Sequence, residues 1–294
     1  MSLIDDFKSQ YKMGDMTTKL IFWNILLFAI PSVLFALLKL FNVPINYYNY
    51  VGLSSNLNQL LMKPWTLFSY SFFHSGFFHI LFNMIMLNFS GKLFTTFFTQ
   101  KQLVGLYVLG GVLGGLLYLI AYLFLPFLQN KSGLLVGASA SVMAILIATT
   151  TYSPYMNLRL ALIGNVKLWH IAIVFLVIDL IQLPLENSGG HLAHIGGALF
   201  GFIYIKALQS GTDLSSGFNS VLDFFVNLFS SKETTPFKKV HKNPKSSNPT
   251  KTTSRVVTKD RAQQQIDEIL DKISQSGYDS LTKEEKEFLF KAGK

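Results

Sequence analysis

Six apolar segments constrain the fold of this chain more than any other feature of its sequence. A helix that spans a membrane needs about 20 mostly apolar residues. The chain is 50% hydrophobic and only 14% charged, whereas soluble domains carry roughly 25% charged residues. We therefore predict an all-α, polytopic membrane protein with six transmembrane helices, at Leu20–Leu40, Phe77–Phe97, Gln102–Phe124, Ser139–Thr151, Trp169–Leu183 and His191–Leu208.

Basic residues in the connecting segments predict the orientation. Cytoplasmic segments of membrane proteins are enriched in lysine and arginine. One side of the predicted bundle carries only Lys39, Lys63, Lys131 and Glu186. The other side carries Lys8, Lys12, Lys19, Lys92, Lys101, Arg159, Lys167 and Lys206. The pattern predicts a multi-pass cell-membrane protein with both termini in the cytoplasm.

The charge distribution also divides the chain into parts. Residues 1–19 are a predicted cytoplasmic N-terminus, and residues 20–210 are the predicted membrane domain. Residues 211–231 are an amphipathic segment that either lies at the membrane interface or packs on the bundle. Residues 232–261 hold nine Lys/Arg and two Asp/Glu, and their polar composition predicts a disordered linker. Residues 262–294 are a small predicted helical piece, with Gly277 as a helix stop and Thr282 and Glu285 as a capping box.

The fourth apolar segment is too short to cross a membrane. Ser139 to Ser153 is 15 residues, which gives a helix of about 22 Å, whereas the hydrocarbon core is about 30 Å thick. The chain before it must therefore enter the membrane as irregular backbone, which is tolerated only beside protein or a water-filled cavity. A serine on the first turn of such a helix is a candidate functional residue.

The sequence Gly137-Ala138-Ser139-Ala140-Ser141 stands at this junction of loop and helix. Backbone N–H groups in a first helical turn have no acceptor within the helix. They can stabilise the oxyanion that forms when a serine attacks a carbonyl. Small residues also let membrane helices pack closely, and on the pentapeptide alone that structural interpretation is favoured.

The sixth segment supplies a candidate base. An ionisable side chain inside a membrane is costly and points to a function. His194, Gly197 and Gly201 share one helix face, and the glycines would let a neighbouring helix approach closely. If that neighbour is the fourth helix, His194 reaches Ser139 and can make it nucleophilic near neutral pH. For His191, at the start of the predicted helix, a hydrogen bond to a backbone carbonyl is the favoured interpretation.

Three other polar residues of the predicted spans are further candidates for the site. His79 and Asn83 are four residues apart and share a helix face, so both can donate hydrogen bonds into a cavity as an oxyanion hole. A polar contact between helices is the alternative. Asp179 could orient a histidine as a third catalytic residue, but no spacing connects it to His194, and a structural partner or a water-filled pocket is favoured.

Competing chemistries lack the residues they need. The chain has no H-E-x-x-H metalloprotease string, and an aspartyl intramembrane protease would need a second aspartate beside Asp179. It shows no internal repeat of the kind found in transporters. It also has no cysteine, which removes thiol nucleophiles and thiolate metal sites. We predict no metal and no cofactor.

In their order along the chain, these motifs resemble the rhomboid family of intramembrane serine proteases over about residues 15–210. The matching motifs are His79-x-x-x-Asn83, Gly137-x-Ser139 and Ala193-His194-x-x-Gly197-x-x-x-Gly201. The resemblance implies a six-helix rhomboid-like bundle with a short fourth helix, expected in a bacterial inner membrane. It also implies a dyad without an aspartate, with Ser139 as nucleophile, His194 as base, and an oxyanion hole from His79, Asn83 and the Ser139 backbone N–H.

The resemblance further implies that transmembrane protein substrates enter sideways from the lipid and are cleaved near the outer face. The alternative is an inactive rhomboid-like protein that binds membrane clients, and the presence of all four site residues argues against it. The predicted partners are transmembrane substrates and membrane lipid. Nucleic-acid binding by the basic linker is disfavoured because that segment lacks interleaved aromatic residues.

Overall fold

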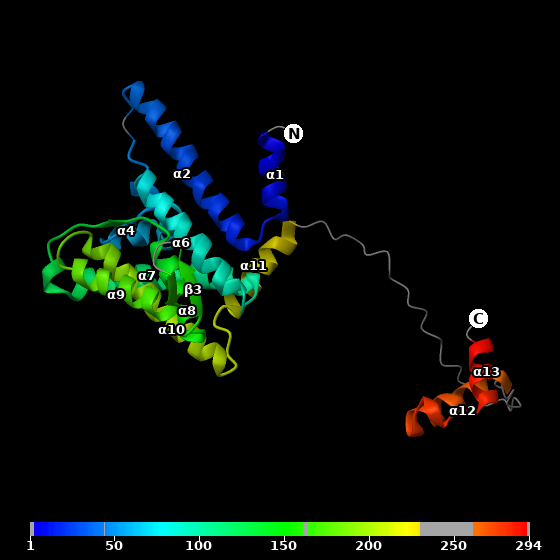
Figure 1. The fold of residues 1–294 in the computed structure, drawn as a ribbon. Coiled ribbons are helices and arrows are strands. Elements are labelled where there is room, and N and C mark those ends of the chain that lie inside the picture. Colours follow the sequence, from blue (N-terminus) through cyan, green and yellow to red (C-terminus); the bar gives the residue numbers. More distant parts are fainter. Residues whose placement is uncertain (1–2, 44, 161–163, 230–260, 293–294) are drawn as a thin grey trace, which may run out of the picture. The chain divides into compact units, whose positions relative to one another are not determined.

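The computed structural model describes residues 3–43, 45–160, 164–229 and 261–292, and the chain forms two compact units, Met1–Lys232 and Glu233–Lys294. Figure 1 shows the helical bundle of the first unit. Its apolar helices are α2 (Met16–Leu40), α6 (Phe77–Thr95), α7 (Gln100–Phe124), α8 (Ser139–Tyr152), α9 (Leu168–Gln182) and α10 (Ser188–Gln209). Each coincides with a segment that the hydropathy pattern predicts.

Four of these helices, α2, α6, α7 and α10, are long and apolar enough to cross a membrane. The other two are shorter, since α8 has 14 residues and α9 has 15. At 1.5 Å per residue they reach only about 21–23 Å. The chain is thus a helical, multi-pass membrane protein, while the count of six spans stays a prediction.

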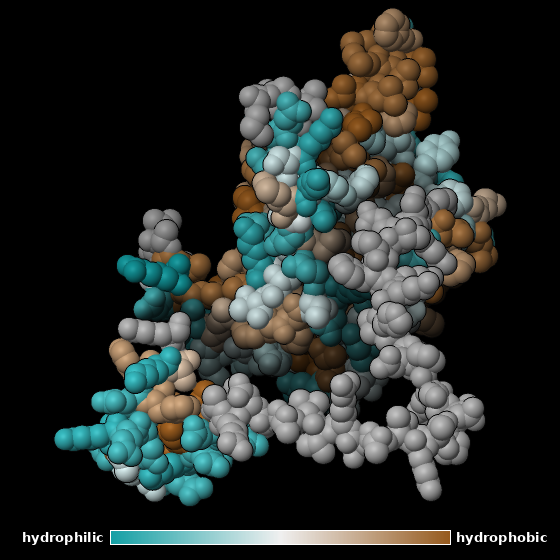
Figure 2. All heavy atoms as spheres, turned by 90° about the vertical axis from the view of Figure 1, so that its right-hand side faces the viewer, coloured by the Kyte–Doolittle hydropathy of each residue, from teal (hydrophilic) through white to brown (hydrophobic). Residues whose placement is uncertain are grey.

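Helix α2 is the least covered of the long helices. Its buried residues are Thr17, Leu20 and Asn24, and Figure 2 shows its far end as a projecting hydrophobic surface. A helix that is apolar all round is stable when lipid surrounds it. Asn24 ties it to the bundle, because its Nδ2 donates to the Tyr107 hydroxyl at 3.0 Å, and that hydroxyl donates to the Ser71 carbonyl oxygen at 2.8 Å.

Helix α8 lies in the core of the bundle. Every residue from Ala140 to Thr149 is buried. The close neighbours α7 and α10 present glycines to it, and a Cβ at Gly114 would come within 2.7 Å of the Ala140 Cβ. Added Cβ atoms at Gly197 and Gly201 would overlap the carbonyl oxygens of Ala140 and Ala144. The backbones of α8 and α10 therefore touch directly, as small residues allow.

The first unit also contains two small antiparallel sheets, which the all-α prediction did not include. Strands β1 (Leu53–Ser54) and β2 (Leu134–Leu135) pair with each other, as do β3 (Asn157–Leu160) and β4 (Gly164–Lys167). Strands of two to four residues are too short to show a period-two hydrophobic pattern. The pairing of β1 with β2 fastens the chain before α8 to the chain before α6.

Short elements complete the first unit. Helix α1 precedes α2, and helix α11 follows α10. Most of the others lie in the connection between α2 and α6. The short elements of the first unit are α1 (Leu3–Met13), α3 (Tyr48–Val51), α4 (Leu57–Met62), α5 (Thr66–Ser69), η1 (Tyr70–Phe72), η2 (Pro126–Leu128) and α11 (Ser216–Phe229).

The described part of the second unit consists of α12 (Arg261–Ser276), η3 (Tyr278–Ser280) and α13 (Lys283–Ala292). Gly277, with a φ of +79°, ends α12. The predicted capping box is present, because the Thr282 N–H donates to Glu285 Oε2 at 2.8 Å and the Glu285 N–H donates to Thr282 Oγ1 at 3.3 Å. The predicted linker, residues 232–261, lies outside the described residues except for Arg261.

Candidate active site

Ser139 is the first residue of α8, and the loop before it is fixed by hydrogen bonds. The Gly137 N–H donates to the Tyr70 carbonyl oxygen at 2.9 Å, and the Ala138 N–H donates to His74 Nε2 at 3.4 Å. Gly137 has a φ of +129°, a conformation that side chains disfavour. Ser139 is thereby held half-buried at a helix start, beside N–H groups that have no acceptor within the helix.

His74 is buried in the loop before α6 and supports the chain that leads into α8. Its side chain is buried, and the Tyr48 hydroxyl donates to its carbonyl oxygen at 2.8 Å. Burial, followed by the neighbouring His79, lowers the pKa of His74 to about 3. The ring is therefore neutral near pH 7, and its Nε2 can accept the Ala138 N–H that leads into α8.

Ser141 points away from the site. Its side chain is fully buried, and an added Cβ at Gly111 of α7 would lie 2.8 Å from its Oγ. Ser139 faces the other way, because an added Cβ at Gly137 would lie 3.6 Å from its Oγ. Of the two serines in the pentapeptide, only Ser139 is therefore half-exposed and near the polar residues of α6.

His79 reaches from α6 to the loop before Ser139. The same added Cβ at Gly137 would lie 2.7 Å from His79 Nε2. The other ring nitrogen, Nδ1, lies 3.0 Å from Ser75 Oγ. Because Nδ1 is engaged by Ser75, Nε2 is the nitrogen available near Ser139.

Asn83 lies one helical turn after His79 on α6, and it is buried. Its Nδ2 donates to the His79 carbonyl oxygen at 2.8 Å. The structure thus places Asn83 on the same helix face as His79, with its amide nitrogen bound to the helix backbone.

Asp179 joins two histidines, which the sequence analysis did not predict. Its Oδ1 lies 2.7 Å from His194 Nδ1 and 2.8 Å from His191 Nδ1. The contact with His194 favours the alternative in which Asp179 orients a histidine over the structural partner or water-filled pocket that the sequence favoured. The backbone carbonyl expected as the partner of His191 is wrong, because its Nδ1 contacts Asp179 instead. Asp179 and His191 are buried, and His194 is half-buried. With Nδ1 held by a carboxylate, His194 has Nε2 left as its second ring nitrogen.

The helix hairpin explains why these three residues meet. Only residues 183–187 connect α9 to α10. Asp179 and His191 are each six positions from Leu185, the middle of that connection. In an antiparallel hairpin, residues equally far from the turn lie opposite each other, so counting outward from the connection was the signal that could have found Asp179.

His194 lies on the turn of α10 that precedes Gly197. Because Gly197 touches the backbone of Ala140, this turn of α10 lies beside the start of α8. The contacts of the described residues include no hydrogen bond between Ser139 and His194, and catalytic hydrogen bonds often tighten only when substrate is bound.

Asp179, His191 and His194 also bring one potential metal-ligand atom each to within 4.8 Å of one another. The two hydrogen bonds to Asp179 account for this arrangement without an ion. The prediction that the site uses no metal stays a prediction.

Comparison with known proteins agrees with this architecture. A family model described as "Rhomboid domain" matches residues 61–210, which is just over half of the chain. The chain belongs to the rhomboid family. The match includes α6, α8, α9 and α10, and therefore every residue of the candidate site. A second model, described as "Family of unknown function (DUF6576)", matches residues 257–291.

Two curated relatives carry the rhomboid name. "Presenilin-associated rhomboid-like protein A, mitochondrial" from Danio rerio is 27% identical over 212 residues, which cover 70% of this chain and 51% of that protein. "RHOMBOID-like protein 1" from Arabidopsis thaliana is 29% identical over 158 residues, which cover 51% of this chain and 36% of that protein. This rhomboid chain thus spans about half the length of the first relative and little more than a third of the second.

Proposed function

We propose that this rhomboid is an intramembrane serine endopeptidase that cleaves transmembrane protein substrates within or near the membrane. The observation that carries the proposal is the grouping at the start of α8. Ser139 is half-exposed there while Ser141 is turned into the helix contact. His79 Nε2 lies beside it, and Asp179 holds His194 on the neighbouring turn of α10.

In the proposed reaction, His194 Nε2 takes the proton of Ser139 as Ser139 Oγ bonds to the carbonyl carbon of the substrate. The His194 proton then passes to the leaving amine as the peptide C–N bond breaks, which leaves an acyl-enzyme on Ser139. Water attacks this ester, His194 accepts its proton, and Ser139 leaves with that proton restored. Asp179 holds the Nδ1 side of the ring during both transfers, as in other serine hydrolases.

The negative charge that develops on the substrate oxygen needs hydrogen-bond donors. We assign this role to the first-turn N–H groups at Ser139, to His79 Nε2 and to the side chain of Asn83. His79 needs its proton on Nε2, which is consistent with Nδ1 accepting from Ser75 Oγ at 3.0 Å. Asn83 would have to turn its amide away from the His79 carbonyl oxygen.

The proposed substrates are single helices that reach Ser139 from the lipid, because the site is built from helices with apolar outer faces. We also propose that the membrane is a cell membrane, such as a bacterial inner membrane. The basic residues of the connecting segments favour an orientation with both termini in the cytoplasm. We propose that all six apolar helices cross or enter the bilayer. All residues of α8 from Ala140 to Thr149 are buried in protein, which fits a short helix that begins inside the membrane.

The second candidate function is that of an inactive rhomboid-like protein that binds membrane clients. Such a protein needs the bundle but not the grouping of Ser139, His194 and Asp179. A direct assay separates the two functions: the full chain, reconstituted in phospholipid vesicles, is mixed with a labelled single-span substrate. Proteolysis predicts two fragments with new ends near the outer membrane border, whereas client binding predicts co-purification with an intact substrate.

Asp179→Asn should lower kcat by up to about 10⁴-fold, the loss seen when a triad aspartate becomes asparagine. The asparagine NH₂ would face His194 Nδ1 and favour the wrong tautomer. KM for the transmembrane substrate should stay within a few-fold, because Asp179 positions His194 and does not touch the substrate. Both constants are measured in vesicles at several substrate-to-lipid ratios.

His191→Asn is the matched control for this variant. It removes the second histidine of Asp179 but keeps the contact of Asp179 with His194, so a much smaller loss of kcat is expected. Equal losses in the two variants, or a loss that appears only in KM, would show that Asp179 merely supports the fold.

Removing residues 233–294 should leave catalysis intact. These residues form their own compact unit, and no residue of the proposed site belongs to it. The truncated chain should cleave the reconstituted substrate with kcat and KM within about two-fold of the full chain, provided it elutes as a single species. Complete loss of cleavage by a well-behaved truncated protein would place part of the machinery in the second unit.

A further inference from the structure

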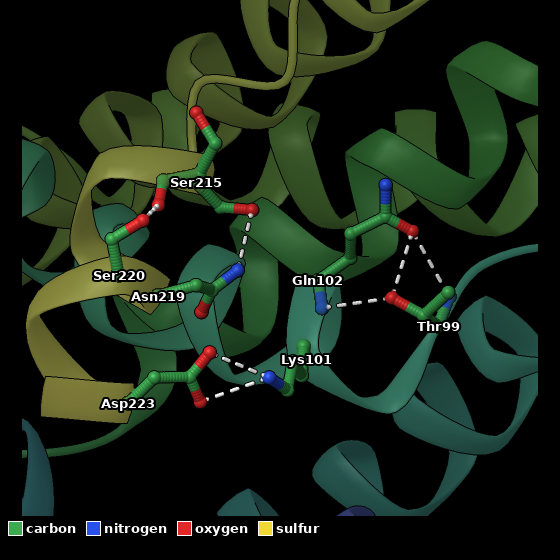
Figure 3. Close-up of polar contacts among 8 residues, drawn as sticks. Thr99, Lys101, Gln102, Ser215, Asn219, Ser220 and Asp223 are labelled. Atoms are coloured by element: carbon green, nitrogen blue, oxygen red, sulfur yellow. Dashed lines mark hydrogen bonds and ion pairs between the residues drawn. The ribbon is translucent and has the colours of Figure 1, made fainter. Parts of the chain in front are cut away.

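Helix α11 is attached to the bundle by its polar side. Asp223 receives two hydrogen bonds from Lys101 Nζ, at 2.7 and 2.8 Å, and Asn219 donates to Ser215 Oγ at 3.1 Å (Figure 3). Asn219 and Asp223 are four residues apart and share one helix face. That face therefore lies against the first turns of α7.

The exposed ion pair of Lys101 and Asp223 contributes little to stability by itself. The turn before α11 is held in place by further, buried contacts. Ser215 is fully buried, and its Cβ fills the space left by Gly105 of α7. Asp213 accepts from the Ser215 N–H at 2.8 Å, from the Tyr204 hydroxyl at 3.1 Å and from Gln102 Nε2 at 3.1 Å. One carboxylate thus joins α7, α10 and the start of α11.

Asp213 is well suited to this role. Burial alone would raise the pKa of Asp213, but the hydrogen bonds from Ser215, Gln102 and Tyr204 outweigh burial and hold that pKa below its ordinary value. The carboxylate is therefore ionised near neutral pH, and all of its partners act as donors. The position of α11 on the bundle is consequently well defined.

The opposite face of α11 is apolar and uncovered. Val221, Phe225 and Leu228 recur at i, i+4 and i+7 on one side, and Phe224 lies next to them. All four side chains are more than half exposed, with exposed fractions between 55% for Phe225 and 63% for Phe224 and Leu228. A helix that docks on a protein in water does the reverse, burying its apolar side and exposing its polar side. This inverted arrangement requires an apolar occupant on the outer side.

The position of α11 identifies that occupant. Six residues separate the end of α10 from the start of α11, and α11 lies against the first turns of α7. Figure 1 shows it lying across the end of the bundle where α6 finishes and α7 begins. The ends of these apolar helices mark one border of the hydrocarbon layer. An amphipathic helix at that border buries its apolar face at the boundary of headgroups and acyl chains.

The charge of the neighbouring sequence favours the same occupant. Residues 232–261, which follow α11, hold nine basic and two acidic residues. Basic segments beside a membrane are attracted to anionic lipid by about 1 kcal/mol per residue near the surface. We propose that α11 is an interfacial helix, tied to α7 by its polar face, whose Val221, Phe224, Phe225 and Leu228 side chains enter an anionic phospholipid surface.

The absence of cysteine from the chain makes a direct test practical. Phe225→Cys on the apolar face and Ser220→Cys on the exposed polar side each receive a nitroxide label. Each full-length protein is reconstituted into vesicles of phosphatidylcholine and phosphatidylglycerol. Electron paramagnetic resonance then measures collisions of the label with oxygen, which concentrates in lipid, and with a nickel chelate, which stays in water.

The proposal predicts that oxygen collisions dominate at position 225 and nickel collisions at position 220. Val221→Cys, on the same apolar face, is a second labelled variant that guards against a local perturbation of the helix at position 225. It should give the same result as Phe225→Cys. Nickel access at both positions would overturn the proposal, because the apolar face would then be in water. A label at 225 shielded from both reagents would also overturn it, in favour of a protein contact such as a second copy of the chain.

Discussion

Ser139→Ala should abolish proteolysis, with kcat falling by about 10⁶-fold as in other serine proteases that lose the nucleophile. The alanine has no oxygen to bond to the substrate carbonyl, so no acyl-enzyme can form. The fold should be unaffected, because Ser139 is half-exposed and the change to alanine removes only its hydroxyl oxygen. Cleavage of the reconstituted single-span substrate measures the loss, and thermal unfolding in detergent should match the unsubstituted chain.

Ser141→Ala is the matched control two residues away. The Ser141 hydroxyl is buried against Gly111, and it has no hydrogen-bond partner among the described residues. Removing an unsatisfied buried hydroxyl costs little and can even be stabilising. Activity should therefore stay near that of the unsubstituted chain. If cleavage survives in Ser139→Ala but disappears in Ser141→Ala, then Ser141 is the nucleophile and the assignment to Ser139 is wrong.

Gly197→Leu should have the second-largest effect, because it forces α8 and α10 apart. A Cβ at this position would overlap the Ala140 carbonyl oxygen and come within 2.8 Å of the carbonyl carbon. These are backbone atoms, which cannot move aside as the end of a flexible side chain can. Forcing bulk into a tight contact costs about 1–3 kcal/mol or more, and the displaced turn also carries His194.

Cleavage should be undetectable in Gly197→Leu, and the unfolding temperature should fall. Gly197→Ala should give an intermediate loss. Leu199→Phe adds bulk to an exposed position of the same helix, and it should keep both activity and stability. Normal cleavage by Gly197→Leu would show that the direct backbone contact between α8 and α10 is not needed to bring His194 to Ser139.

The positions of the apolar helices follow from sequence because hydropathy over about 20 residues is a strong signal. Helix α6 begins at Phe77 as predicted, and α8 begins at Ser139 and is as short as predicted. The spacing of His194, Gly197 and Gly201 also predicts a close helix contact on the correct face. These features are local to one helix, so one segment of sequence is enough to predict them.

Features that depend on contacts between segments could not be predicted in this way. Asp179 reaches His194 only because the five-residue connection folds α9 back along α10. The pairing of β1 with β2 joins residues about 80 positions apart. The choice between Ser139 and Ser141 depends on which one faces Gly111 of α7. The outward apolar face of α11 likewise becomes evident only once Lys101 and Asp223 are seen together.

A fluorophosphonate probe reports whether Ser139 is an activated nucleophile. The probe reacts with the oxygen of an activated serine and forms a stable adduct, which peptide mass spectrometry assigns to one residue. We expect an adduct on Ser139 in the unsubstituted chain and in Ser141→Ala, much slower labelling in Asp179→Asn, and no adduct in Ser139→Ala. An unsubstituted chain that folds but does not react, or an adduct that maps to Ser141, would contradict the proposed role of Ser139.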